Sequence, residues 1–123
     1  MKKTILTAAA LIAITSNVSA ADIKMTDYSF GKGNYDMGGS ITVTLENVSN
    51  KEVVAAKYTI ICNDAFGDRA LGMKVKDRSL NLKPGASDSS TWVPNMFSKS
   101  ADILKNNKAE NFECFLEDVK TVN

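Results

Sequence analysis

One long apolar run, from residue 53 to residue 68, dominates the pattern of hydrophobic and polar positions after residue 20. Between residues 53 and 62 the run is typical of a β-strand, whose side chains point alternately to opposite faces. One face is apolar throughout and is expected to point into a core: Val54, Ala56, Tyr58, Ile60 and Cys62. The other face includes Lys57 and Thr59 and is expected to be partly exposed. A loop that pivots on Gly67 and Gly72 should follow over residues 63–72.

Alternation with a period of two predicts further strands on both sides of this run. Residues 40–48 alternate cleanly, whereas residues 23–30 alternate without an apolar face, as an edge strand does. Other strands are expected at residues 73–75, 79–82, 91–93 and 110–122. Residues 98–107, capped by Ser98 or Ser100, form the single predicted helix or helical turn. Many short strands with almost no helix predict an all-β, antiparallel β-sandwich, with Trp92 filling part of the core.

The first twenty residues carry a different pattern, that of a secretory signal peptide. Lys2 and Lys3 precede an apolar core, and Val18-Ser19-Ala20 fits the small-x-small pattern of a cleavage site. The apolar core is shorter than the ~20 residues that span a bilayer. We therefore expect residues 1–20 to be removed near Ala20, and residues 21–123 to form a single domain in the bacterial periplasm or outside the cell. No transmembrane segment is expected in that mature chain.

The charge balance of the mature chain disfavours nucleic acid as a partner. The sequence has 15 basic and 14 acidic residues, so the loss of Lys2 and Lys3 leaves 13 against 14 and a net charge of −1. Proteins that hold a phosphate backbone usually carry a basic excess.

The two cysteines, Cys62 and Cys114, both fall on apolar faces of predicted strands. An even number of cysteines in a secreted domain favours a disulfide. The bridge can join two facing sheets or two neighbouring strands of one sheet, and the sequence leaves both arrangements open. A zinc site would need carboxylates to complete it, because the chain has no histidine.

Residues 61–82 resemble a known family. A strand ends in Cys-Asn-Asp-Ala-Phe-Gly-Asp, and a short strand and Leu-Lys-Pro-Gly follow. This arrangement, over about residues 40–93, is similar to the FxLYD-like and related small extracytoplasmic β-sandwich domains of bacteria. The resemblance implies an immunoglobulin-like sandwich and a secreted role, and it implies no catalytic residues. The chain departs from the family at Asn63-Asp64, where a Tyr-Asp pair is usual, and at Cys62, where an aliphatic or aromatic residue is usual.

The sequence lacks the residues on which most catalytic sites depend. It contains no histidine, which removes the usual general base near neutral pH and every nucleophile paired with histidine. Asp64 and Asp68 share one loop, where they could hold calcium or could shape the turn through hydrogen bonds to the backbone. We expect no enzyme activity, no catalytic residue, no cofactor and no metal site, with calcium at Asp64 and Asp68 left as an open alternative.

Apolar side chains in loops are the candidate binding residues, because loops on a rigid sandwich commonly contact partners. They are Phe66, Leu71 and Met73 in or beside one loop, and Pro94, Met96 and Phe97 in another. Phe66 and Phe97 have an alternative role, in which they fold back and cap the core. Tyr28 and Tyr35, beside glycine-rich turns, could stack on sugar rings.

These features predict a periplasmic or secreted binding domain without enzyme activity, whose partner is another envelope or extracellular protein. Two alternatives remain open at this point. One is an inhibitor of an exogenous hydrolase that inserts a protruding loop, for which residues 94–98 are the candidate. The other is a module that binds carbohydrate or the cell envelope.

Overall fold

The computed structural model describes residues 21–32, 38–95 and 98–123. The predicted signal peptide, Tyr35, Met96 and Phe97 lie outside the described residues. The elements, in chain order, are β1 (Ile23–Lys32), β2 (Gly39–Asn47), β3 (Ala55–Asn63), β4 (Arg69–Asp77), β5 (Ser87–Trp92), α1 (Lys99–Asn106), η4 (Ala109–Asn111) and β6 (Glu113–Val122).

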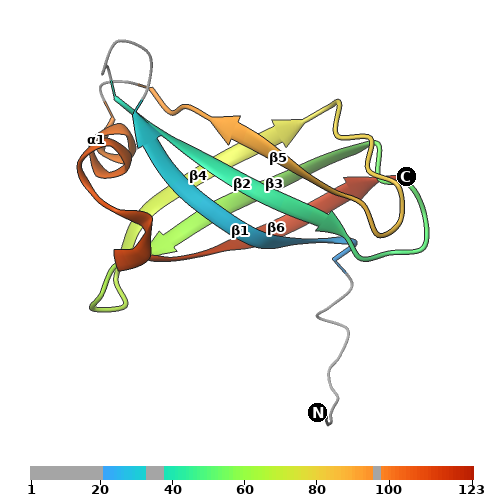
Figure 1. Ribbon diagram of the computed structural model, residues 1–123, viewed down its shortest axis with the longest axis horizontal. Helices are drawn as coiled ribbons and strands as arrows, with labels where there is room; N and C mark the ends of the chain where they lie inside the picture. The colour runs from blue at the N-terminus through green and yellow to red at the C-terminus, as the bar shows by residue number, and fades with distance from the viewer. Residues whose placement is uncertain (1–20, 33–37, 96–97) are drawn as a thin grey trace, which may run out of the picture.

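The strands form two antiparallel sheets that pack face to face (Figure 1). One three-stranded sheet has the order β1-β2-β5 and the other has the order β4-β3-β6. In immunoglobulin-like domains, strands A, B and E share one sheet while C′, C and F share the other. The two orders correspond to this arrangement, so the predicted all-β, immunoglobulin-like sandwich is confirmed.

The core lies between the sheets and is built from the inward faces of β2 and β3. Along β2, Ile41, Val43 and Leu45 are all 1% exposed or less, as their clean alternation predicts. Along β3, Tyr58, Ile60 and Cys62 are equally buried. Trp92 of β5 packs against this cluster from the edge, and its Nε1 donates a hydrogen bond to Tyr58 Oη at 3.2 Å. This bond joins the two sheets.

Strand β1 has an apolar face that its simple alternation conceals. The pairing with β2 shifts between Met25 and Asp27, where Thr26 is the extra residue of a bulge. Because a one-residue insertion exchanges the two faces of a strand, Met25 before the bulge and Tyr28 after it both turn toward the core. The expectation that neither face of this strand is apolar is therefore wrong.

Three shorter predictions need correction. The strand expected at residues 73–75 is the nine-residue β4. Leu71, Met73 and Val75 alternate along its inward face, and the exposed Gly72 lies within the strand and does not end the preceding loop. The strand expected at residues 79–82 is a turn, in which only Leu82 makes a bridge, to Val53. The strand expected at residues 91–93 is β5, which begins at Ser87 and ends at Trp92, and two of its hydroxyl side chains bond to threonines of β2.

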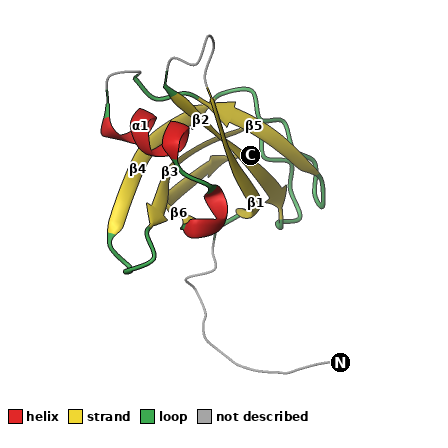
Figure 2. Ribbon diagram, turned by 60° about the vertical axis from the view of Figure 1, so that its left-hand side comes forward, coloured by secondary structure: helices red, strands yellow, loops and turns green. Residues whose placement is uncertain are grey.

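The predicted helix is confirmed as α1, which covers one end of the sandwich beside β1, β2 and β4 (Figure 2). Ser98 is its N-cap, and Ser98 Oγ accepts a hydrogen bond from the Ala101 backbone N–H at 3.2 Å. Ala101 and Leu104 are buried on its inner face. Within the described part of the chain, no helix is long and apolar enough to cross a membrane.

The predicted disulfide joins Cys62 and Cys114, with a Cα–Cα distance of 4.0 Å. The two residues are direct partners in the register of β3 and β6. The bridge therefore links neighbouring strands of one sheet, which settles the alternative that the sequence left open.

Candidate functional site

The loop between β3 and β4 extends from one end of the sandwich (Figure 1). It carries Phe66, whose side chain is 89% exposed and is the most exposed large apolar side chain of the described residues. A phenylalanine in this position leaves almost its whole ring in water, although burial of such a ring is worth about 1.5–3 kcal/mol. The alternative role in which Phe66 folds back on the core does not occur.

Asp64 holds this loop in a fixed shape through hydrogen bonds to the backbone. Its Oδ1 accepts from the N–H groups of Phe66 at 2.9 Å and Asp68 at 3.0 Å. Backbone bonds also join Asp64 N to Asp68 O at 2.8 Å and Gly67 N to Asp64 O at 2.9 Å. Gly67 has φ +82°, a conformation that side chains with Cβ rarely adopt. Phe66 is thus displayed at the tip of a rigid turn.

The base of the loop is also tied to its neighbours. Cys62, bridged to Cys114, immediately precedes Asn63 at the end of β3. On the other side, Arg69 pairs with Glu117 of β6 at 3.5 Å, between Nη2 and Oε1. Each arm of the loop is therefore connected to β6, which restricts how far the tip can move relative to the sheet.

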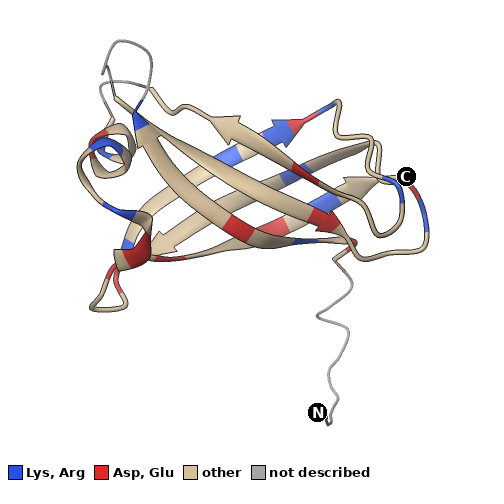
Figure 3. Cartoon of the chain, in the orientation of Figure 1, with Lys and Arg blue, Asp and Glu red and all other residues tan. Residues whose placement is uncertain are grey.

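Acidic residues lie on both sides of Phe66 in the loop, and others occur in the segment that leads into β6. Asp64 and Asp68 lie in the loop itself, Glu110 lies in η4, and Glu113 is the register partner of Asn63. Figure 3 shows acidic segments at this end of the sandwich, with basic segments among them. An apolar tip flanked by the carboxylates of its own loop is complementary to an apolar pocket bordered by basic residues.

The other candidate binding residues occupy different environments. Leu71 is 2% exposed and belongs to the core, and Met73 is half-buried against it. Both lie in β4 rather than in a loop, because the strand begins at Arg69. Met96 and Phe97 lie outside the described residues. Of the predicted contact residues that the structure describes, Phe66 is the one that is exposed on a loop, whereas Pro94, in the loop after β5, is half-buried.

The calcium and sugar-stacking alternatives gain no support from this geometry. Asp64 Oδ1 already accepts two N–H bonds, and the described residues contain no cluster of three potential metal ligands. Tyr28 is half-buried, and its Oη donates to the Phe112 carbonyl oxygen at 2.8 Å. Its ring therefore packs between the sheets instead of facing solvent.

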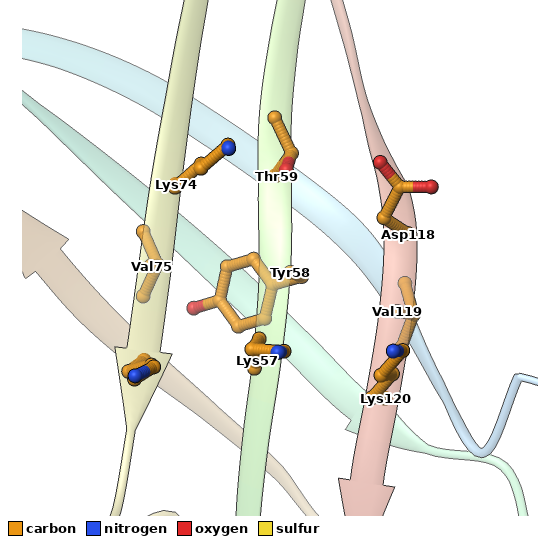
Figure 4. A pocket seen from close by; sticks show the side chains of 9 residues that line it. Lys57, Tyr58, Thr59, Lys74, Val75, Asp118, Val119 and Lys120 are labelled. Atoms are coloured by element: carbon orange, nitrogen blue, oxygen red, sulfur yellow. The ribbon is translucent and has the colours of Figure 1, made fainter.

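A second surface feature, which the sequence reading missed, is an open hollow of about 620 Å³ on the outer face of β4-β3-β6 (Figure 4). Lysines from all three strands line it: Lys57, Lys74, Lys76 and Lys120. Below it, burial raises the pKa of Tyr58 to about 12, an effect to which Asp77 adds and which the hydrogen bond from Trp92 reduces. The alternating lysines of β4 were visible in the sequence, but their neighbours on β3 and β6 follow only from the register.

No family model, no curated protein and no solved structure matches this chain. The function therefore has to be inferred from the chemistry of the two surfaces, the Phe66 loop and the lysine-lined hollow. They lie at opposite ends of β3, because Lys57 is near its start and Asn63 is its last residue.

Proposed function

We propose that this protein is a periplasmic or secreted binding domain without enzyme activity, which captures another envelope or extracellular protein through the Phe66 loop. The observation that carries the proposal is a rigid turn that holds a phenylalanine 89% exposed. Protein interfaces obtain most of their binding energy from a few central side chains, and aromatic anchors are prominent among them.

The rigidity of the loop supports a binding role in a second way. Ordering a side chain and its loop at an interface costs about 0.5–1.5 kcal/mol for each immobilised side chain. Asp64 has already fixed the backbone on both sides of Phe66 through its two hydrogen bonds. The partner then meets a loop that needs little further ordering, so more of the burial energy of the ring appears as affinity.

The surrounding charges and the disulfide define the kind of partner and the compartment. Asp64 and Asp68, on both sides of Phe66 in the loop, favour a partner whose apolar pocket is bordered by lysine or arginine. The Cys62–Cys114 bridge is of a type that persists in oxidising compartments such as the periplasm and the extracellular medium. The signal-like pattern of residues 1–20 agrees with this location.

Substitution of the anchor tests the proposal. Phe66→Ala should weaken capture of the partner by about tenfold or more, because loss of a buried ring removes at least about 1.4 kcal/mol. A photo-crosslinking amino acid at position 66 first identifies the partner in envelope and culture-medium extracts. Affinities for that purified partner are then measured by calorimetry.

Val48→Ala is the matched control, because Val48 is also an apolar side chain, 48% exposed, on a different loop. It should bind as the wild type does. Crosslinking that recovers no protein above background would remove the basis of the proposal, and so would equal affinities for the Phe66→Ala variant and the wild type.

The same loop favours one alternative, an inhibitor of an exogenous hydrolase. A rigid projecting turn with one exposed aromatic tip has the form needed to enter a substrate pocket, and it is a second candidate inhibitory loop beside residues 94–98. A panel of proteases and glycosidases separates the two functions. Inhibition that disappears in Phe66→Ala supports the inhibitor, whereas a non-catalytic crosslinked partner supports the binding domain.

A further inference from the structure

Three lysines stand side by side across the sheet β4-β3-β6. Lys57 of β3 is the direct register partner of Lys76 on β4 and of Lys120 on β6. Neighbouring strands are only about 4.7–4.9 Å apart, so the row places three positive charges over a short distance. Like charges directly opposite one another destabilise a sheet. A fold that needed only stability would not place lysine at all three positions.

No carboxylate of the described residues forms an ion pair with any lysine of the row or with Lys74. The register places Glu117 across Thr59 from Lys74, but Glu117 pairs with Arg69 instead, at 3.5 Å. The opposite sheet behaves differently. There Lys24 has Glu46 as its direct partner, and the two side chains form an ion pair at 3.9 Å.

The charged side chains surround a hollow of the size of a small-molecule site. Its volume of about 620 Å³ lies within the roughly 300–1,000 Å³ typical of ligand pockets. A bulge in β6 shapes it, since the pairing with β3 shifts between Lys57 and Thr59 and Asp118 adopts φ +53°. Lys74, Lys57 and Lys120 project from three strands over this stretch of sheet (Figure 4).

The polar groups of the hollow are not all cationic. Besides the four lysines, the Asp118 carboxylate and the Thr59 side chain line it. The lysines can neutralise two phosphate groups, whereas a carboxylate beside them would repel a phosphate but accept a hydrogen bond from a hydroxyl. A ligand that satisfies all of these groups carries more than one phosphate together with neighbouring hydroxyls.

We propose that this hollow binds a phosphorylated saccharide. Its phosphates lie against Lys57, Lys76 and Lys120, and its hydroxyls bond to Asp118 and Thr59. The small size of the hollow and the carboxylate within it favour such a ligand over a flat anionic lipid surface or a nucleic acid backbone. The site is independent of the Phe66 loop and goes beyond the proposed function, because it lies near the other end of β3.

Calorimetric titration with glucose 1,6-bisphosphate tests this site. The wild type should bind it saturably, and Lys57→Glu should weaken binding by at least about tenfold, because the variant turns the centre of the row into an ion-pair partner for both neighbours. The same variant should melt at a higher temperature than the wild type, because opposite charges replace like charges across the sheet, so weaker binding would not reflect unfolding. Lys83→Glu, an equal change of charge in an exposed turn, should leave binding unchanged.

Selectivity provides the second readout. Asp118→Asn keeps a residue type that tolerates positive φ but removes the carboxylate charge. It should reduce the preference for glucose 1,6-bisphosphate over inorganic phosphate. Phe66→Ala should bind the sugar phosphate as the wild type does, so failure of one site does not imply failure of the other.

Four results with the wild type would overturn the proposal. They are no saturable binding, equal affinity for glucose 1,6-bisphosphate and inorganic phosphate, binding confined to vesicles of anionic phospholipid, and binding confined to a single-stranded oligonucleotide. Undiminished binding by Lys57→Glu would do the same, because the row would then have no part in recognition.

Discussion

At the scale of single residues, Asn47 shows how a buried polar group can organise two turns. Its side chain is fully buried, and Nδ2 donates to the carbonyl oxygens of Lys51 at 2.8 Å and Leu82 at 2.9 Å. Its Oδ1 accepts from Ser49 N at 2.9 Å and from Ser49 Oγ at 2.7 Å. Every hydrogen-bonding position is used, so the group is buried without the usual cost of about 1–3 kcal/mol for an unsatisfied one.

The ionisation of Tyr58 should lower the stability of the protein at high pH. Burial raises its pKa to about 12 in the native state, whereas an unfolded tyrosine has a pKa of about 10. Between these values the unfolded chain loses the proton first, so the free energy of unfolding falls as pH rises. Below about pH 10 the buried neutral Tyr58 makes its full contribution to the free energy of unfolding. By pH 12 that free energy has fallen by at most about 2.7 kcal/mol on account of Tyr58.

Chemical denaturation of the wild type and of Tyr58→Phe between pH 9 and pH 12 measures this effect. Tyr58→Phe is less stable at neutral pH, because Trp92 Nε1 loses its acceptor, but it should lack this part of the alkaline fall. Tyr28→Phe keeps Tyr58, so its free energy of unfolding should fall with rising pH as that of the wild type does. Parallel pH curves for the wild type and Tyr58→Phe would contradict the assigned cause.

At the scale of elements, the accuracy of the sequence predictions depended on bulges and register. Strand β2 alternates without interruption and β3 does so as far as Ile60, so their existence and inward faces were predictable, although Ile61 on the outer face of β3 is also buried. A bulge in β1 and another in β6 exchange the two faces, and no local pattern reveals the extra residue. Phe66 could be proposed as a contact residue because it is an apolar residue within a predicted loop. The lysine row could not, because it depends on the pairing of three strands.

The contact between α1 and β2 gives the element-scale prediction. A Cβ added at Gly39 would lie 2.5 Å from Leu104 Cβ and 2.6 Å from the Leu104 carbonyl carbon. The helix would have to move away from the sheet, and overpacking of this kind costs roughly 1–3 kcal/mol. Gly39→Ala should therefore lower the melting temperature by about 4–8 °C for each kcal/mol lost.

Gly72→Ala is the control for this substitution, since the nearest atom to its added Cβ, Ile61 Cδ1, is 3.6 Å away. That distance is ordinary van der Waals contact, and Gly72 lies within β4. Calorimetric melting of both variants should therefore show a loss for Gly39→Ala alone. Equal melting temperatures for the two variants would mean that α1 does not approach β2 so closely.

At the scale of the whole molecule, the disulfide lies within one sheet, whereas non-covalent contacts join the two sheets. The Cys62–Cys114 bridge lies within the sheet β4-β3-β6, unlike the bridge between sheets in antibody domains. The two sheets are joined instead by the apolar core and by bonds such as Trp92 to Tyr58 at 3.2 Å. The bridge does not clamp the layers together, and it acts mainly by shortening the free length of the unfolded chain.

This division predicts a large loss of stability without a change of fold when the bridge is removed. The two cysteines are 52 residues apart, and closing a loop of that length stabilises a protein by about 4 kcal/mol in the chain-entropy model. Replacement of both cysteines by alanine should lower the melting temperature by roughly 15–30 °C while the circular dichroism spectrum stays that of a β-sandwich. The reduced wild type serves as the reference, since it lacks the bridge but keeps both side chains, and it should melt at nearly the same low temperature. A thiol assay on the oxidised, unfolded wild type should detect no free thiol, and the detection of two thiols would exclude the bridge.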